Sequence, residues 1–318
     1  MVSKSEENKI METPLVSIVI PTYNRKSMLV RLLDSIYGSD YPLEKLEIIV
    51  INDASTDGTE GEIEEKYPKV KLITNKDELF SSLSRNIGIK NAKAEFIFLI
   101  DDDNVVDKSC ISELINVITS TEKSYFVGPL MYYYSDRKRV AWAGAKRNKL
   151  TSLTKVFTEF SNSKSIQKTE YVPNAIMIRK KIAEKVGMFD GKNFPFHYDD
   201  GDFCQRAKME RCDIVFSTKA KVWHDIPLPE KINDRTRLFH CNTEKLAYYN
   251  SRSRILYQHK YTSKGQFFIF LIIFNWAVAL YYFKIILIDS KKTTREKFRL
   301  LKAYFKGNIS GLRTIFYD

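Results

Sequence analysis

The sequence predicts an α/β fold, a mostly parallel β-sheet with flanking helices, followed by a membrane-associated helical segment at the C-terminus. From Val16 onward, short apolar runs alternate with stretches of helical periodicity, which is the pattern of a parallel sheet with crossover helices. Polar residues follow several of these runs, at the edge where open parallel sheets bind ligands. Beyond residue 261, the chain becomes apolar over a length sufficient to cross a bilayer and then becomes basic.

Four apolar runs are the expected strands of the parallel part of the sheet, and helical segments lie between them. Leu29, Leu32, Leu33 and Ile36 fall at positions i, i+3, i+4 and i+7, which predicts a helix over Lys26–Tyr37. The strands are expected at 16–21, 46–52, 70–74 and 95–100, and the later crossover helices at 59–66, 82–90 and 109–119.

The middle of the chain, residues 125–178, is richer in β-forming and turn residues, so we expect mixed or antiparallel strands that complete the sheet. A helix-like stretch follows at 236–259. These limits divide the chain into a polar leader at 1–14, a globular domain at 15–261 and a membrane-associated region at 262–318. The leader has no apolar segment of the kind found in signal peptides and membrane anchors.

The apolar part of the C-terminal region, 266–288, is interrupted only by Asn275 and Lys284. Lysines and arginines flank it on both sides, so the positive-inside rule does not fix an orientation for a single span. A span, a segment in the plane of the membrane and a buried helix of the globular fold all stay open. In the basic amphipathic tail at 291–318, one helical face suited to anionic lipid contains Phe298, Leu301, Tyr304 and Phe305.

Composition narrows the possible partners and the redox state. The formal net charge of +12 attracts anions, among them nucleotides, anionic lipid headgroups and nucleic acid. Because the lysines and arginines gather near the apolar C-terminal run, lipid is favoured over nucleic acid. The four cysteines form no Cys-x-x-Cys pair and have no histidine at zinc spacing, so we expect reduced structural thiols.

The strongest local signal is an apolar strand that leads directly into Asp101, Asp102 and Asp103. Three carboxylates packed so closely require a counter-ion, and Mg²⁺ or Mn²⁺ binds such oxygen ligands together with substrate phosphates. A solvated acidic loop that caps the next helix is the alternative. The run is not an EF-hand, because the sixth position lacks glycine and Ser112 occupies the twelfth, and the chain has no P-loop motif.

A second acidic cluster follows His197 and contains Asp199, Asp200 and Asp202. It precedes a helix-like stretch, so its carboxylates would lie at a helix N-terminus, where capping alone also explains acidic residues. Two separate clusters suggest a division of labour in which the first holds metal and phosphate and the second takes a proton.

Several stretches, taken in order, carry a shared set of motifs: VSIVIPTYNR at 16–25, IVINDASTDGT at 49–59, SRNIG at 84–88, DDD at 101–103, VGMFD at 186–190 and DDGDF at 199–203. Together they resemble the inverting GT-A glycosyltransferases of family 2, in a rhamnosyltransferase-like subgroup. The resemblance covers roughly residues 16–261 and includes a late histidine, His224.

The resemblance implies that the globular domain is a GT-A catalytic domain that transfers a sugar from a nucleoside diphosphate sugar. It implies Asp200 as the general base, and Asp103 and His224 as ligands of Mn²⁺ or Mg²⁺. The other contacts that it implies are Pro21, Tyr23, Asn24, Asp53, Arg85, Asp101 and Asp102 with the donor, and Asp199 and His197 with the acceptor.

Two departures from the family pattern limit what is carried over. Asp199 stands where the family usually has glutamate, which changes the reach of that side chain but leaves Asp200 in place. The motif Gln-x-x-Arg-Trp is absent, which disfavours a processive polysaccharide synthase.

The resemblance and the C-terminal region together suggest the substrates and the location. We expect a UDP- or dTDP-sugar as donor and a glycan hydroxyl as acceptor, and the glycan can be polyprenyl-linked. The expected location is the cytoplasmic face of the cell membrane. This corresponds to a role in glycoconjugate or cell-surface polysaccharide biosynthesis, with no nucleic-acid partner. The rival interpretations are a catalytically inactive GT-A protein that binds nucleotide sugars, and a nucleic-acid-binding protein with salt-dependent affinity.

Overall fold

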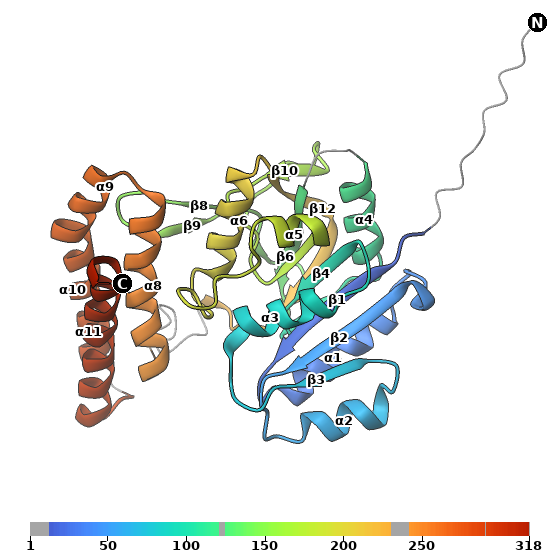
Figure 1. Cartoon of the computed structure of the whole chain (residues 1–318), viewed down its shortest axis with the longest axis horizontal. Helices are drawn as coiled ribbons and strands as arrows, with labels where there is room; N and C mark the ends of the chain where they lie inside the picture. The colour runs from blue at the N-terminus through green and yellow to red at the C-terminus, as the bar shows by residue number, and fades with distance from the viewer. Residues whose placement is uncertain (1–12, 121–124, 230–241, 290, 318) are drawn as a thin grey trace, which may run out of the picture.

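The computed structural model describes residues 13–120, 125–229, 242–289 and 291–317. Within them, a ten-stranded mixed sheet with its covering helices lies beside a group of long C-terminal helices (Figure 1). The expected polar leader falls outside the described residues up to residue 12.

The N-terminal half of the sheet is parallel, as expected. Strand β1 (Val16–Thr22) pairs with β2 (Leu46–Asn52) on one side and with β4 (Phe96–Ile100) on the other, and β3 (Lys71–Thr74) pairs with β2 at the edge. Every residue of β1 and β4 is buried. This explains why both appear in the sequence as continuous apolar runs rather than as alternating ones.

The crossover helices lie close to their expected positions. Helix α1 has the expected bounds, Lys26–Tyr37, and buries the four residues of the expected face. Helix α3 (Phe80–Asn91) starts two residues before the expected position and packs on β1 at Gly88, where a Cβ atom would lie 2.1 Å from Val19. The other crossover helices are α2 (Thr59–Lys66) and α4 (Cys110–Thr119), and a short 3₁₀ turn covers Leu43–Lys45.

The middle of the chain forms the mixed strands that its composition predicts. Strand β11 (Ala175–Arg179) is antiparallel to β4 and to β6 (Tyr125–Tyr133), and β6 is parallel to β12 (Asp213–His224). Strand β12 also pairs with β5 (Asn104–Val106), which directly follows the aspartate run. The remaining elements are β7 (Val140–Trp142), β8 (Ala145–Arg147), β9 (Thr154–Val156), β10 (Ile166–Lys168), α5 (Lys180–Lys185) and α6 (Asp199–Met209).

The C-terminal part consists of helices that run side by side (Figure 1). Helix α8 (Glu244–Tyr261) starts after the N-cap Thr243, whose hydroxyl accepts the Leu246 N–H at 3.2 Å. The expected helix at 236–259 therefore starts later among the described residues, while 236–241 lie outside them. The other elements are α9 (Lys264–Ile269), a π-helical stretch (Phe270–Phe274), α10 (Asn275–Ile288) and α11 (Thr294–Tyr317).

The expected apolar segment is one continuous helix over Lys264–Ile288, with a mean hydropathy of 2.0. Among the described residues it is the one helix long and apolar enough to cross a membrane, and only 28% of its apolar window is buried. The predicted apolar face of the tail is wrong in one respect. Tyr304 is fully buried and its hydroxyl accepts a hydrogen bond from Arg254, whereas Phe298 and Phe305 are exposed.

Candidate active site

The carboxyl ends of the parallel strands border a cavity of about 370 Å³. Five of the predicted donor residues line it: Pro21, Tyr23, Asp53, Asp101 and Asp102. The sequence therefore predicted most of the residues that line the cavity at this end of the sheet. The lining residues that it missed are Thr22, Arg25, Glu78, Phe80, Ser81, Phe196, Lys245 and Leu246.

The middle aspartate of the run is buried and held by neutral and charged donors. Asp102 accepts a hydrogen bond from the Thr22 hydroxyl at 2.7 Å and pairs with Arg25 at 3.0 Å. Burial raises the pKa of Asp102 to about 7, although Arg25 acts in the opposite direction. Arg25 lies in the loop after β1, immediately before α1, and provides the counter-charge that the aspartate run requires on the donor side.

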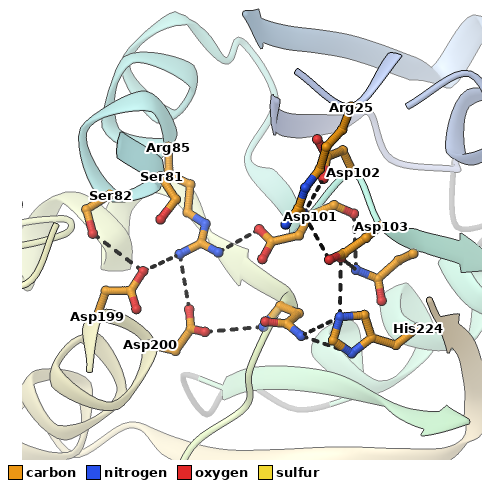
Figure 2. Close-up of polar contacts among 12 residues, drawn as sticks. Arg25, Ser81, Ser82, Arg85, Asp101, Asp102, Asp103, Asp199, Asp200 and His224 are labelled. Carbon is orange, nitrogen blue, oxygen red and sulfur yellow. Dashed lines mark hydrogen bonds and ion pairs between the residues drawn. The ribbon is translucent and has the colours of Figure 1, made fainter. Parts of the chain in front are cut away.

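The third aspartate and the late histidine meet, although 121 positions separate Asp103 from His224 in the chain. His224 Nε2 lies 3.3 Å from Asp103 Oδ1, because β12 pairs His224 with Asn104 (Figure 2). Burial acts to raise the pKa of Asp103, but His224 and Arg25 lower it to about 2. Burial acts to lower the pKa of His224, and Asp103 raises it above its ordinary value.

This pair suits a divalent cation only in part. Asp103 and His224 offer one oxygen and one nitrogen ligand side by side, and Mg²⁺ typically takes one or two protein ligands plus substrate phosphates and water. Across the described ranges, no group of three or more His, Cys, Asp and Glu side chains is placed to hold a metal ion. A cation at this position would therefore depend on a diphosphate for much of its coordination.

A single buried guanidinium joins the two acidic clusters. Arg85, on α3, lies 2.6 Å from Asp101, 2.7 Å from Asp199 and 3.3 Å from Asp200 (Figure 2). Burial acts to lower the pKa of Arg85, but the three carboxylates raise it above its ordinary value. The clusters that the sequence places about a hundred residues apart thus form one continuous charged site.

The expected general base lies in the first turn of α6. Asp200 accepts a hydrogen bond from the backbone N–H of Asn174 at 3.3 Å, and its side chain remains 18% exposed. Burial raises the pKa of Asp200 to about 7, while Arg85 acts in the opposite direction. A carboxyl group with this pKa exchanges protons near neutral pH, which is the property required of a general base.

Two further predicted residues also have structural roles. Asp53 is buried, and its two carboxylate oxygens accept the backbone N–H groups of Leu79 at 2.9 Å and Phe80 at 2.8 Å. Asn24 accepts the Thr56 N–H at 2.7 Å and so joins the loops that follow β1 and β2. Asp53 therefore fixes the start of α3, and Asn24 connects two loops but does not itself line the cavity.

The two predicted acceptor residues have different surroundings. Asp199 is buried between Arg85 and the Ser82 hydroxyl, 3.5 Å away (Figure 2). The His197 ring packs on Phe196 with the ring centroids 4.6 Å apart, and Phe196 itself lines the cavity.

The sequence did not predict the aromatic residues that form one wall of the cavity. Phe80 stacks on Phe196 at 5.3 Å, and Tyr249 of α8 packs edge-on against both rings. Lys245, also on α8, lies 4.0 Å above the Phe80 ring and pairs with Glu78. No spacing rule distinguishes these aromatic residues from core residues. Phe80 has a φ of 66°, a backbone strain that only the structure reveals.

Comparison with known proteins gives one family match and partial relatives. The family model described as glycosyl transferase family 2 matches residues 17–187, more than half of the chain. The poly(ribitol-phosphate) beta-N-acetylglucosaminyltransferase TarS of Staphylococcus aureus is 31% identical over 100 residues. That alignment covers 30% of this chain and 18% of TarS, so the chain matches less than a fifth of that relative's length.

Two solved structures resemble the chain in fold. GalNAc-T7 with UDP, GalNAc and Mn²⁺ superposes with a TM-score of 0.60 at 15% identity, over 80% of this chain and 54% of that one. The mannosyltransferase PcManGT of Pyrobaculum calidifontis, in complex with GDP-Man and Mn²⁺, superposes with a TM-score of 0.56 at 15% identity, over 96% and 86%. At these identities the similarity concerns the architecture alone.

Proposed function

Because the chain belongs to glycosyl transferase family 2 and has the GT-A fold, we propose that it transfers a sugar from a nucleoside diphosphate sugar to a glycan hydroxyl, with inversion at the anomeric carbon. The observation that carries this proposal is the position of Arg85, which contacts Asp101 at the donor cavity and Asp200 at the start of α6. A phosphate-side carboxylate and a proton acceptor thus share one site, as transfer to a hydroxyl requires.

The cavity at the ends of β1 and β2 would hold the donor. Tyr23, which is 42% exposed at its rim, and Asp53 would contact the base, with a uridine or thymidine nucleotide favoured. Phe80 and Phe196 add aromatic surface to the lining, against which a nucleotide base can pack. Arg25 and Lys245 add positive charge to the lining, which suits a diphosphate.

Asp103 and His224 would hold Mn²⁺ or Mg²⁺, which supplies positive charge to the diphosphate leaving group when bound. Arg25 adds a second positive charge at the same carboxylate, 3.0 Å from Asp103. The two complexes compared above both contain Mn²⁺, which supports the choice of cation.

Asp200 would take the proton from the acceptor hydroxyl as the oxygen attacks the anomeric carbon from the face opposite the diphosphate. Its raised pKa leaves a substantial ionised fraction at neutral pH while keeping the carboxylate basic. A single base suffices for inversion, and Asp199 and His197 would orient the acceptor.

We also propose that the C-terminal helices hold the site at a membrane surface. A stripe along the 264–288 helix is exposed, and the neighbouring helix α11 is rich in lysine and arginine, which suits anionic lipid. A lipid-linked glycan acceptor at the cytoplasmic face fits this location. The stripe contains Phe268, Ile269, Ile272, Ile273, Trp276, Leu280 and Leu287.

The packing of α8 supports attachment in the membrane plane rather than a span. Ion pairs bind α8 to the sheet domain near both of its ends, Lys245 with Glu78 and Lys260 with Asp202. Because α10 runs alongside α8 and α11 (Figure 1), a span along α10 would draw α11 and part of the sheet domain into the hydrocarbon. Each charged residue of α11 at the bilayer centre would cost about 2.5–3.5 kcal/mol.

A donor screen tests the proposed reaction most directly. We expect the full chain with Mn²⁺ to hydrolyse one class of UDP-, dTDP- or GDP-sugar slowly, and NMR of the early product to show the inverted anomer. Protection by a nucleotide sugar in a thermal-shift assay without any turnover would instead favour the inactive binding protein. Retention of configuration would refute the single-base mechanism.

A further inference from the structure

A second cavity, of about 240 Å³, lies between the β8–β9 hairpin, α6 and α8. Arg147, Lys149 and Lys208 line it, against one carboxylate, Glu170. Within the described part of the chain none of the three cations forms an ion pair, and Glu170 accepts the backbone N–H of Arg147 at 2.8 Å. The cavity therefore has an excess of positive charge that the protein itself does not neutralise.

The arginine of this cavity is rigidly placed and keeps unused donors. Its guanidinium lies 4.1 Å from the ring centroid of Tyr198 and 4.5 Å from that of Tyr257, so two aromatic faces fix its plane. The Nε and Nη1 atoms of Arg147 are buried without a hydrogen-bond partner among the described residues. Buried donors without partners are costly, and an arginine fork matches the oxygens of a phosphate.

The two lysines complete the positive lining. Burial lowers the pKa of Lys208, the charge of Glu170 opposes this shift, and the smaller effect of Lys149 adds to it. The Lys149 carbonyl accepts a hydrogen bond from Gln258 of α8 at 2.8 Å, which joins the hairpin to that helix. An anion in the cavity would be attracted by both lysines that line it.

The cavity lies between the proposed base and the proposed membrane helices. A Cβ atom on Gly201, the residue after Asp200, would lie 3.4 Å from Arg147 Nη2. On the other side, the lining includes Tyr261 and Thr262, and one residue, Ser263, separates them from the 264–288 helix. The cavity thus adjoins both the start of α6 and the point where the apolar helix begins.

From this lining and this position we propose that the second cavity binds a phosphate group carried by the acceptor. The proposal rests on the proposed function, since it assigns the acceptor a phosphate near the base. The phosphate can belong to a polyprenyl headgroup or to a soluble phosphorylated acceptor, and the cavity would recognise the same oxygens in both.

The test compares phosphate binding by two double variants of the full chain. We expect calorimetric titration with inorganic phosphate and with a short-chain polyprenyl phosphate to show at least tenfold weaker binding after Lys149→Gln and Lys208→Gln. The control, Lys146→Gln with Lys219→Gln, removes the same charge from exposed lysines outside the lining and is expected to bind like the unmodified chain.

The two ligands separate the sources of the phosphate. Tighter binding of the polyprenyl phosphate, lost in the cavity variant, assigns a lipid headgroup, and equal binding of both ligands assigns a soluble acceptor. Equal affinities of the cavity variant and the control variant would overturn the inference. Thermal-shift protection by nucleotide sugars is measured on the same proteins. If the unmodified chain is not protected, the proposed function is refuted. If it is protected but the cavity variant binds phosphate as the control does, only the proposed phosphate site is refuted.

Discussion

At the scale of single residues, the site depends on side chains whose charges are balanced by one another. Arg85 forms ion pairs with carboxylates of both acidic clusters, and Arg25 forms ion pairs with Asp102 and Asp103 of the first cluster. The resemblance assigned a role to Arg85 but none to Arg25, although Arg25 ends the first of the shared motifs. Removing either guanidinium would leave buried carboxylates without a counter-charge, which is costly.

Replacing the proposed base separates binding from transfer. We expect Asp200→Asn to bind the donor normally and to lose transfer by about 10²–10⁴-fold, because the amide cannot accept the hydroxyl proton. Donor affinity by thermal shift and transfer rates by product quantification check this. Asp213→Asn, in a surface pair with Lys168, serves as the control with near-normal rates. Full turnover by Asp200→Asn would refute the assignment.

The pH profile follows from the raised pKa of Asp200. Its basic form predominates above about 7, so we expect kcat/KM to fall as the pH drops through about 7 rather than near 4. The pKa of Asp102 is also about 7, and Asp102→Asn therefore distinguishes the two groups. If the protonation of Asp200 causes the fall in kcat/KM at low pH, the fall persists in Asp102→Asn. If the fall disappears in this variant, it is assigned to Asp102.

The proposed cation site predicts a change in metal dependence. In the unmodified chain we expect Mn²⁺ to increase the donor affinity. In Asp103→Ala this increase should be at least about tenfold smaller, because His224 is then the only one of the two proposed metal ligands that remains. Donor titrations with Mn²⁺ and with a chelator measure this difference. An unchanged difference in the variant would exclude Asp103 as a ligand.

At the scale of elements, local pattern determined the helices and strands, and distant contacts determined their ends. The face of α1 was readable from spacing alone. Helix α3 starts at Phe80 because the carboxylate of Asp53, in the loop after β2, accepts the N–H groups there. Strand β3 starts at Lys71 rather than at the expected residue 70, because the Val70 N–H donates to the Tyr67 carbonyl. Such contacts are invisible in a single sequence.

Close helix packing gives a prediction for α11. A Cβ atom on Gly307 would lie 2.1 Å from the Tyr248 carbonyl oxygen of α8, so Gly307→Ala should push the helices apart and cost about 1–3 kcal/mol of unfolding free energy. Denaturant titration measures the loss. Gly61→Ala in α2, where nothing lies within 4 Å, is the control and should be neutral or stabilising.

At the scale of the whole molecule, the sequence predicted the order of the parts but not their mutual placement. It predicted an α/β fold with parallel N-terminal strands and an apolar helix, and these are present, but the complete sheet is mixed rather than mostly parallel. It could not reveal that α8 supplies Lys245 and Leu246 to the cavity wall, because that contact joins residues far apart in the chain. The rhamnosyltransferase-like subgroup and the limits of the domains stay predictions.

The proposed in-plane attachment has a direct test at Trp276. This residue lies at the middle of the 264–288 helix and is 56% exposed, so a span would place it at the bilayer centre, and an in-plane helix would place it near the headgroups. We expect its fluorescence on anionic vesicles to be quenched by bromine near the headgroup end of the lipid chains. Subtracting the fluorescence of the Trp276→Phe variant isolates the contribution of Trp276. Stronger quenching by bromine at the ends of the lipid chains would show a span.

The ion pairs at the two ends of α8 have a consequence for acceptor choice. Because Lys245 and Lys260 bind α8 firmly to the sheet domain, the distance from Asp200 to the lipid would be set by the thickness of packed helices instead of by a flexible tether. Glycans of different length project their terminal hydroxyls to different heights above a bilayer. An enzyme attached in this way would select acceptors by length and extend only glycans whose terminal sugar reaches the height of Asp200 above the bilayer.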